Sequence, residues 1–375
     1  MKNKTLDPIT LDTKTTLVNL ANSLLCHFGV APFHETIPEV DRLLAGHRKV
    51  ALFLFDGMGE AILSGFPRSS RYLLAHKELT IHSVNPATTA AATTALLSGR
   101  FPIETGWLGW SLMFDELGFP IDVFPSTNSV TGEHLPKGLM AKKCPYVRLD
   151  ELMRGAGVKA KASFQFPIAD DGPTTLAEVE SQASSFFQEE GGEFLYSYWT
   201  NPDHDLHCYG TKAFRIGRDI RQIGRTVKRF AAHNPDVLVL VIADHGLIDV
   251  HYRDLAAFPE LHECLAKPLT IDGRCCNFFI KFGMKPQFEA AFAKHFPNFH
   301  LFSKEEVLAM NFFGEGKPCE QALSFLGDYL SVPQGDELLV DTILSPNVKA
   351  YRAHHAGPSP EEKNIALLCF NRDGK

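Results

Sequence analysis

The sequence predicts an α/β protein whose mainly parallel sheet is flanked by helices. Residues 49–55 form a continuous apolar run, which is typical of a strand covered on both faces. Helical stretches at 89–97, 176–188 and 212–233 separate this run from others like it, and such alternation favours a parallel sheet between helices. The other predicted strands are 79–84, 194–199, 237–242 and 365–370.

The pattern changes between residues 265 and 340. A strand-like stretch at 277–282, a helical stretch at 287–295 and several turn residues replace the regular alternation. We therefore expect a small α+β cap insertion at 265–340. Residues 1–264 and 341–375 would then form the α/β catalytic core.

Composition places the chain among ordinary globular proteins. It has 375 residues, a net charge of -7, 45% apolar residues and 22% charged residues, which is enough to bury a large core. Because an acidic chain has no broad attraction for nucleic acid, we expect no binding of nucleic acid duplexes and only local recognition of phosphate. The sequence leaves the oligomeric state open.

The sequence also carries no signal for export or membrane insertion. No run of about 18 apolar residues occurs, so we expect no membrane span. Residues 1–10 lack the apolar run of a secretory signal. The 8 cysteines are scattered without a Cys-x-x-Cys pair, which favours reduced thiols. We therefore predict a cytoplasmic location.

Acidic and histidine side chains lie at the ends of the predicted strands. In an open α/β sheet ligands bind outside the carboxyl ends of the strands, so these side chains would meet in one crevice. Carboxylate and imidazole ligands suit zinc, and less exclusively manganese or iron. Six of them are about what two metal ions need. The six are Asp56, Asp203, His207, Asp244, His245 and His355.

Each of these residues also has a simpler interpretation. Asp56-Gly57 after a strand is usually a turn, and Asp203 with His207, spaced i and i+4, is often a surface pair. Asp244-His245 after an aliphatic run is more specific, because a buried charged pair is costly unless it caps a helix or binds something. The elements together favour a metal site more strongly than any one of them.

A threonine at the start of the predicted helix 89–97 is a candidate nucleophile. Thr89 could simply cap the helix. A helix N-terminus also attracts a phosphoryl group, however, and metal coordination activates a hydroxyl as a nucleophile. Spacing alone leaves Thr88, Thr93 and Thr94 as competitors.

The order of these motifs resembles that of the alkaline phosphatase superfamily, in its type I phosphodiesterase/nucleotide pyrophosphatase branch. Five anchors carry the resemblance between about residues 49 and 370. They are Leu54-Phe55-Asp56-Gly57-Met58-Gly59, Pro86-Ala87-Thr88-Thr89 running to Ser98-Gly99, Asn201-Pro202-Asp203-His204-Asp205-Leu206-His207, Ile242-Ala243-Asp244-His245-Gly246 and His354-His355-Ala356-Gly357-Pro358-Ser359-Pro360-Glu361-Glu362.

The resemblance implies a division of roles. One metal would be held by Asp56, Asp244, His245 and the Thr89 oxygen, and the other by Asp203, His207 and His355. The family nucleophile lies ten residues before the Gly of a Ser/Thr-Gly pair. Gly99 therefore selects Thr89, which would take the phosphoryl group before hydrolysis releases it. The last motif of the family usually reads His-Gly-Gly. His355-Ala356-Gly357 fits this pattern, so the resemblance implies His355 rather than His354 as the metal ligand.

The chain departs from the family after this helix. Nucleotide phosphodiesterases place there an Asn that binds a phosphoryl oxygen, whereas this chain has Gly109-Trp110-Ser111. Ser111 or a backbone amide would donate instead. For Trp107 and Trp110, core packing is the favoured interpretation.

The resulting hypothesis is a hydrolase of small phosphate esters or nucleotide-like substrates that uses two divalent ions, zinc or else manganese. A phosphodiesterase or pyrophosphatase is favoured. Phosphomonoesterase and phosphonoacetate hydrolase activities are the alternatives within the superfamily, and a non-catalytic zinc-binding module is the alternative outside it. A mutase of the superfamily typically uses Ser, and a sulfatase needs a Cys/Ser-x-Pro-x-Arg motif that does not occur at Thr89.

Overall fold

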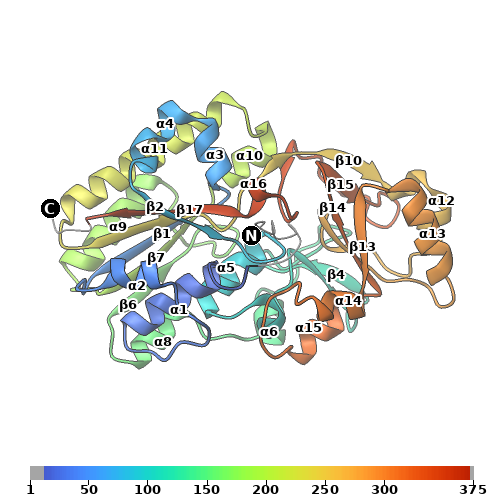
Figure 1. Ribbon diagram of the computed structural model, residues 1–375, viewed down its shortest axis with the longest axis horizontal. Helices are drawn as coiled ribbons and strands as arrows, with labels where there is room; N and C mark the ends of the chain where they lie inside the picture. Colours follow the sequence, from blue (N-terminus) through green and yellow to red (C-terminus); the bar gives the residue numbers. More distant parts are fainter. Residues whose placement is uncertain (1–11, 372–375) are drawn as a thin grey trace, which may run out of the picture.

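The computed structural model describes residues 12–371, which form two large β-sheets surrounded by helices (Figure 1). The first sheet has six strands. Their order is β2 (Lys77–His82), β17 (Asn364–Phe370), β8 (Leu238–Ile242), β1 (Val50–Phe55), β7 (Phe194–Trp199) and β6 (Ala160–Ser163). The five predicted strands are all present, with the second one beginning and ending two residues earlier than expected.

The first sheet is mainly parallel, which confirms the predicted fold class. β1 is parallel to β7 and β8, and β6 is parallel to β7. β17 alone runs the other way, antiparallel to both β8 and β2. β1 and β8 are buried along their whole length, as a continuous apolar run predicts. β6 is absent from the prediction because its four residues are partly exposed and lack such a run.

Helices cover both faces of the first sheet (Figure 1). On one face α4 (Pro67–Leu74) packs against α11 (Phe214–His233), which also packs on α9 (Leu176–Gln188). On the other face α1 (Leu17–His27) packs against α2 (Pro38–Leu44), α5 (Thr89–Ser98) and α8 (Leu149–Gly155). The other helices near this sheet are α3 (Glu60–Gly65), α6 (Pro102–Thr105), α7 (Leu139–Lys143), α10 (Asp203–Tyr209) and α16 (Pro360–Lys363).

The second sheet is antiparallel and has seven strands. Their order is β13 (Phe299–Ser303), β14 (Tyr329–Pro333), β12 (Cys275–Phe278), β11 (Thr270–Asp272), β3 (Ser111–Phe114), β4 (Phe119–Asp122) and β5 (Thr127–Asn128). It therefore joins strands from residues 111–128 to strands from 265–340. The division into a core and a cap at residues 265 and 340 stays a prediction.

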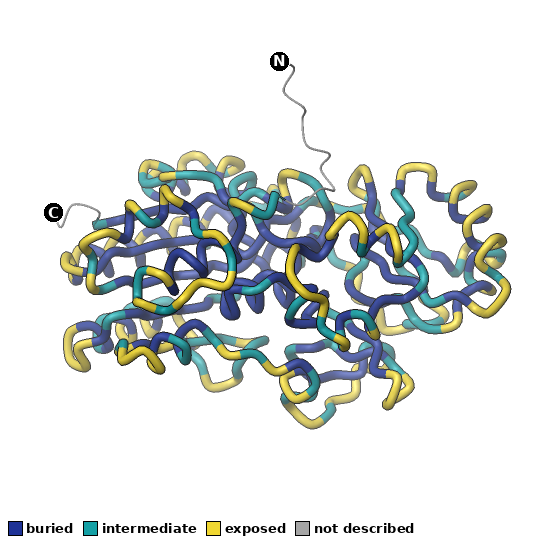
Figure 2. Tube along the Cα trace, turned by 60° about the horizontal axis from the view of Figure 1, so that its bottom comes forward, coloured by how far each residue is buried: buried dark blue, intermediate teal, exposed yellow. Residues whose placement is uncertain are grey.

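The outer end of the second sheet has an apolar core of its own. Phe278, Phe288, Phe292 and Phe296 are almost completely buried there, and their rings lie in edge or tilted contact. Phe288, Phe292 and Phe296 come from α13 (Lys285–His295) and its C-cap, and α13 packs against α12 (Pro259–His262). Figure 2 shows buried segments running through the centre of the molecule, with exposed segments mainly at loops and helix ends.

Short elements complete the fold. Two further strand pairs are β10 (His251–Asp254) with β15 (Glu337–Val340), and β9 (Ile248–Asp249) with β16 (Ala353–His354). The remaining helices are η1 (Leu255–Ala257), α14 (Lys304–Ala309) and α15 (Glu320–Phe325). Within residues 12–371, no helix combines the length and apolarity that a membrane crossing requires. The N-terminal residues 1–10, used above to predict location, lie outside the described residues.

A buried ion pair joins the two sheets. Arg274, in the turn between β11 and β12, donates from Nε to Glu362 Oε1 at 2.6 Å and from Nη2 to Oε2 at 2.8 Å. Both side chains are completely buried. Arg274 also donates to the carbonyls of Gly335 and Glu337. The pair thus ties the second sheet to α16 beside the first sheet.

Replacement of Arg274 tests how much this ion pair contributes to the stability of the protein. Arg274→Met leaves the Glu362 carboxylate buried without its cation, so we expect a loss of roughly 3–5 kcal/mol in apparent unfolding free energy. The double variant Arg274→Met/Glu362→Gln removes both charges and should be less destabilised than the single variant. Urea denaturation of the three proteins measures this. Equal stability of Arg274→Met and the parent would show that the pair does not hold the sheets together.

Candidate metal centre

Carboxylate and imidazole side chains converge at the carboxyl edge of the first sheet. Asp56 directly follows β1, Asp203 opens α10 after β7, and Asp244 and His245 follow β8. His355 precedes β17. Because β17 is antiparallel to β8, its beginning lies at the edge where β8 ends. All of these residues are at least nine-tenths buried.

The first cluster consists of Asp56, Asp244 and His245, whose ligand atoms lie within 4.8 Å of one another. His245 Nε2 is 3.4 Å from Asp56 Oδ1 and 3.5 Å from Asp244 Oδ2. The hydroxyl of Thr89 lies 3.1 Å from His245 Nε2 and 3.5 Å from Asp56 Oδ2. A single cation among these atoms would therefore also lie beside the Thr89 hydroxyl.

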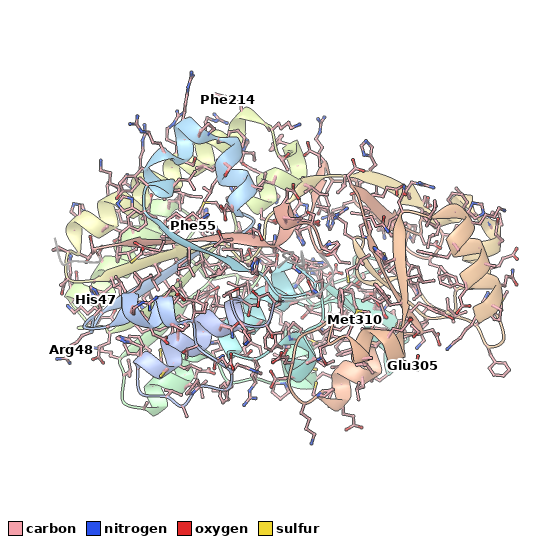
Figure 3. The ribbon with its side chains drawn as sticks, viewed as in Figure 1. His47, Arg48, Phe55, Phe214, Glu305 and Met310 are labelled. Atoms are coloured by element: carbon pink, nitrogen blue, oxygen red, sulfur yellow. The ribbon has the colours of Figure 1, made fainter. Side chains whose placement is uncertain are left out.

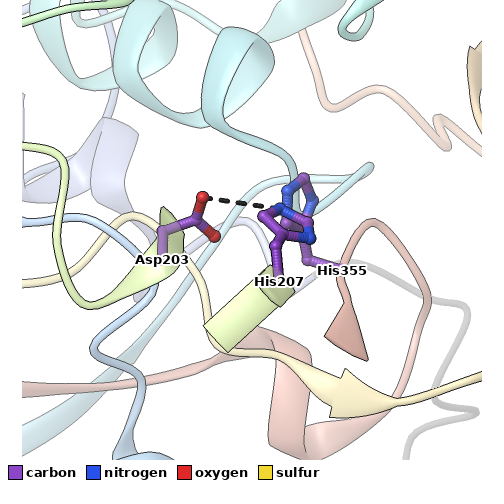
Figure 4. Close-up of side chains that lie close together, drawn as sticks. All are labelled: Asp203, His207 and His355. Carbon is purple, nitrogen blue, oxygen red and sulfur yellow. Dashed lines mark ion pairs between the residues drawn. The ribbon is translucent and has the colours of Figure 1, made fainter. Parts of the chain in front are cut away.

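The second cluster consists of Asp203, His207 and His355 (Figure 4). Asp203 and His207 lie one turn apart on α10, and His207 Nε2 is 3.4 Å from Asp203 Oδ2. The other ring nitrogen of His207, Nδ1, is 2.8 Å from the Ala353 carbonyl, which orients the imidazole. The His355 and His245 ring centroids are 4.0 Å apart, so the two clusters adjoin.

Glycines let the loops that carry these ligands approach one another. Gly57 follows Asp56 with a φ of +70°, and a Cβ there would lie 2.9 Å from the Asp203 backbone. A Cβ on Gly246 would lie 2.2 Å from the Glu361 carbonyl. In place of such contacts, Gly246 N donates to the Glu362 carbonyl at 2.8 Å. Glycine is thus required at positions 57 and 246 because neighbouring backbone leaves no room for a Cβ, and at Gly57 also because of the positive φ.

Glu362 also holds the loop that carries His355. Its Oε1 accepts a hydrogen bond from the Gly357 amide at 2.7 Å, in addition to that from Arg274. Ala356, between His355 and Gly357, has a φ of +83°, a conformation that L-residues seldom adopt. The surrounding contacts therefore hold this loop in a strained form.

Burial opposes ionisation of the Asp56 and Asp203 carboxyl groups. It raises the pKa of Asp56 well above its usual range, and the neighbouring Asp244 and Asp203 carboxylates raise it further. Burial likewise raises the pKa of Asp203 to about 7. Tyr198 donates a hydrogen bond to Asp56 Oδ2, which favours the charged form. These acids would ionise fully at neutral pH if a nearby positive charge balanced them.

Burial keeps His207 and His355 neutral. It lowers the pKa of His207 to about 4 and the pKa of His355 well below its usual value, and neighbouring imidazoles lower the latter further. A neutral imidazole is the form that binds a metal. The cluster therefore combines acids that need a cation with imidazoles that have a lone pair to donate.

Unpaired buried atoms show that the residues fit divalent cations. Asp56 Oδ1, Asp203 Oδ1, Asp244 Oδ2 and His355 Nδ1 are buried, and none has a hydrogen-bond partner in the described part of the chain. Unsatisfied buried polar atoms are rare and costly. Both clusters contribute such atoms, and all four are of the type that zinc or manganese accepts.

The structure adds Asp272 and His354 to the residues predicted from the sequence. Asp272, His354 and His355 form a third, overlapping group of potential ligands, with Asp272 Oδ1 3.3 Å from His354 Nδ1. Burial raises the pKa of Asp272 to about 7. In the sequence Asp272-Gly273 reads as an ordinary turn. Only the docking of the β11–β12 turn brings Asp272 to the first sheet.

The competing threonines occupy distinct positions. Thr88, not Thr89, is the N-cap of α5, and its hydroxyl lies 3.3 Å from Asp272 Oδ2. Thr93 donates to the carbonyl of Thr89 at 2.6 Å. Thr89 is the first helical residue, with its hydroxyl beside the first cluster. Its role as nucleophile stays a prediction.

Ser111 lies in β3, where it pairs with Ile271, the neighbour of Asp272. Its hydroxyl is 2.8 Å from that of Ser129, and its role in binding substrate stays a prediction. Trp107 is buried and donates to the Cys144 carbonyl at 2.9 Å, in keeping with a core residue. Trp110 is partly exposed and contacts Phe124 edge-on.

Comparison with known proteins identifies the family. A family model described as type I phosphodiesterase/nucleotide pyrophosphatase matches residues 50–311, which is more than half of the chain. The chain belongs to this family. The resemblance deduced from the motifs is thereby confirmed, and family membership supports a phosphoester hydrolase of the phosphodiesterase/pyrophosphatase type.

Solved structures of the same fold are distant in sequence. An inactive variant of murine ectonucleotide pyrophosphatase/phosphodiesterase 5 in complex with AMP is 16% identical, with a TM-score of 0.64 over 86% of this chain and 88% of that one. The human enzyme of the same name is 14% identical, with a TM-score of 0.64 over 86% and 87%. Phosphonoacetate hydrolase from Sinorhizobium meliloti in complex with phosphonoformate is 13% identical, with a TM-score of 0.64 over 88% and 94%. No curated protein matches the chain.

Because Asp203 is a buried acid, we expect Asp203→Asn to have opposite effects on protein stability in the presence and absence of metal. The pKa of Asp203 lies at about 7 rather than 3.8. The folded metal-free chain therefore holds this proton more tightly than the unfolded chain, and its stability falls as pH rises from about 4 to about 7. Asp203→Asn should be more stable than the parent at pH 8 without metal, by a margin that shrinks as pH falls through this window.

With added zinc or manganese the parent should be more stable than Asp203→Asn, because only the parent keeps the carboxylate ligand. Melting temperatures of both proteins, with chelator and with metal, measure the effect. Ser197→Ala, a nearly buried polar residue on β7 outside both clusters, is a control that should respond to metal like the parent. If metal stabilises Asp203→Asn as much as the parent, Asp203 is not a ligand.

Proposed function

We propose that this chain is a two-metal phosphodiesterase/nucleotide pyrophosphatase that attacks its substrate with Thr89. The observation that carries the proposal is the position of the Thr89 hydroxyl, 3.1 Å from His245 Nε2 and beside Asp56, at the first residue of α5. A hydroxyl in contact with a set of metal-type ligands, at a helix start that attracts anions, suits attack on a phosphate ester.

The two clusters divide the metal-binding roles. Asp56, Asp244, His245 and the Thr89 oxygen would hold one ion, and Asp203, His207 and His355 the other. Two divalent ions supply Lewis-acid stabilisation of the phosphoryl charge and make the threonine hydroxyl easier to deprotonate. The mixture of carboxylate and imidazole favours Zn²⁺, with Mn²⁺ as the alternative.

The residues of the chain then perform the chemistry in two steps. The Thr89 Oγ attacks phosphorus as its proton passes to solvent, and a phospho-threonine forms. The bond from phosphorus to the leaving ester oxygen breaks, and that oxygen takes a proton from solvent and departs as an alcohol. Water then attacks the same phosphorus and the bond to Oγ breaks; one water proton goes to Oγ, which restores the Thr89 hydroxyl, and the phosphoryl product leaves with the rest of the water. The free backbone amides at the start of α5 favour the negative charge in both steps. The buried setting strengthens these electrostatic effects.

The substrate that we propose is a small phosphate diester or a nucleotide-like pyrophosphate in the cytoplasm. Support comes from the family and from the murine relative, whose inactive variant is in complex with AMP. Ser111 is proposed to donate a hydrogen bond to the phosphoryl group in place of the family Asn. Its strand, β3, adjoins β11, which carries Asp272 to the clusters.

One observation favours a second candidate, a phosphonoacetate hydrolase. Gly109-Trp110-Ser111 stands where nucleotide phosphodiesterases have the Asn, so the amide side chain that binds a phosphoryl oxygen in those enzymes is replaced. The phosphonoacetate hydrolase from Sinorhizobium meliloti has a TM-score of 0.64 and is covered over 94% of its length. Phosphonoacetate therefore belongs among the substrates to be tested.

Metal content and substrate preference test the proposal together. We expect about two zinc or manganese ions per chain by plasma mass spectrometry. We also expect faster cleavage of bis-p-nitrophenyl phosphate than of p-nitrophenyl phosphate. Faster cleavage of the monoester would reassign the protein as a phosphomonoesterase, and phosphate release from phosphonoacetate would favour the second candidate. A chain that neither retains nor regains metal would refute the two-metal mechanism.

Substitution of Thr89 tests the nucleophile. Thr89→Ala should lower the turnover number by at least about a thousandfold, because it removes the attacking oxygen, while most of the metal is retained. Thr89→Ser keeps a hydroxyl and should retain part of the activity. Rapid quenching of Thr89→Ser with a radiolabelled diester should trap label on residue 89.

Thr93→Val is the matched control, since Thr93 is one turn further along α5, is buried and lacks contact with either cluster. It should keep its metal and nearly all of its activity. If Thr89→Ala hydrolyses diesters as fast as the parent, the nucleophile lies elsewhere. If the parent binds two metals but hydrolyses no phosphoryl or phosphonate substrate, the chain is a metal-binding module.

A further inference from the structure

A basic groove lies between α4 and α11. Figure 1 shows these two helices on one face of the first sheet. The volume of the groove is about 480 Å³, within the range of small-molecule sites. None of its lining residues belongs to the metal centre. The lining residues are Arg68, Ser69, Arg71, Tyr72 and Ala75 on the α4 side, and Arg221, Gly224, Arg225 and Lys228 on the α11 side.

The charge of this groove is of one sign. Five of its lining residues are cationic and, among the described residues that line it, none is acidic. The four arginines form no ion pair with any described residue; Arg221 donates only to the Ser69 hydroxyl, at 3.4 Å. By contrast, Arg215 and Arg229 of the same helix pair with Asp205 and Glu180.

The spacing of the cations places them in two rows, one on each helix of the groove. Arg221, Arg225 and Lys228 are separated by four and three residues and so lie on one exposed face of α11. Arg68 and Arg71, three residues apart, form the facing row on α4. The half-buried Tyr72 ring lies between the rows, 5.5 Å from the Lys228 ammonium. The groove thus combines two rows of cations with an aromatic surface.

Such a concentration of positive charge is unusual in this chain. The net charge of the protein is -7, yet five unbalanced cations repel one another across one groove. A bound polyanion would relieve that repulsion, and it would make several charge-assisted hydrogen bonds with guanidinium groups, whose planar fork suits phosphate.

We propose that this groove binds a free small molecule carrying several phosphate groups, at a site separate from the metal centre. The two facing rows of cations and the small volume of the groove fit a compact polyanion better than an extended surface. The exposed Phe214, which would suit insertion into a membrane, lies at the start of α11 and outside the groove lining (Figure 3).

Displacement of a fluorescent polyanion tests the proposal on the metal-loaded protein. The probe is pyrene tetrasulfonate, which carries no phosphoryl group to be hydrolysed and whose sulfonates are weak metal ligands. We expect it to bind with one-to-one stoichiometry, and inorganic tripolyphosphate to displace it at far lower concentration than orthophosphate. Arg221→Ser/Arg225→Ser should weaken probe binding by at least about tenfold, because two charge-assisted contacts are lost.

The matched control is Lys212→Ser/Arg218→Ser. It removes the same charge from the same region of the chain, but both residues lie outside the groove lining and are exposed. It should leave probe affinity within about twofold of the parent. Equal binding by the groove variant and the parent, or equal weakening in the two double variants, would overturn the proposal.

Two further assays separate other anionic partners. One measures sedimentation with vesicles of equal parts phosphatidylcholine and phosphatidylserine, and the other measures binding of single-stranded oligouridylate. If the groove variant loses binding to vesicles or to the oligonucleotide while tripolyphosphate fails to displace the probe from the parent, the groove serves a membrane or RNA. The proposal of a small-molecule site would then be wrong.

Discussion

The arrangement of the metal centre depends on the carboxylate of Glu362 and the guanidinium that balances it. Glu362 receives two hydrogen bonds from Arg274, one from the Gly357 amide beside His355, and its carbonyl accepts from Gly246 beside His245. One buried residue therefore positions ligand loops of both clusters and anchors the second sheet. Because a buried charge without its partner is costly, the two sheets cannot separate without disturbing the site.

The same physical constraint, charge in a buried setting, shapes the ligands themselves. The carboxylates of Asp56 and Asp203 lie where burial and mutual repulsion oppose ionisation, and the imidazoles of His207 and His355 lie where burial opposes protonation. A divalent cation resolves both conditions at once. The residues that would perform the chemistry are thus a source of instability in the metal-free protein, and metal binding would be linked to folding.

The second sheet forms part of the surroundings of the candidate metal centre. Its β11–β12 turn brings Asp272 to His354, and β3 carries Ser111 alongside it. Ile271, within β11 and next to Asp272, has a positive φ of +73°, so the backbone beside the site is held in a strained form. The basic groove between α4 and α11 lies away from this surface, so recognition of an anion there would be independent of the hydrolytic site.

The sequence by itself determined the α/β class, the strands β1, β7, β8 and β17 to within a residue, and the six acidic and histidine side chains that meet at the sheet edge. It could do so because buried strands and close-approach glycines impose local patterns. Tertiary structure alone decided that β3–β5 join the second sheet, that Asp272 and His354 reach the clusters, and that Arg274 pairs with Glu362. Those contacts join segments that are far apart in the chain. The short strands and turns involved carry no periodic sequence signal, because the segments against which they pack set their conformation.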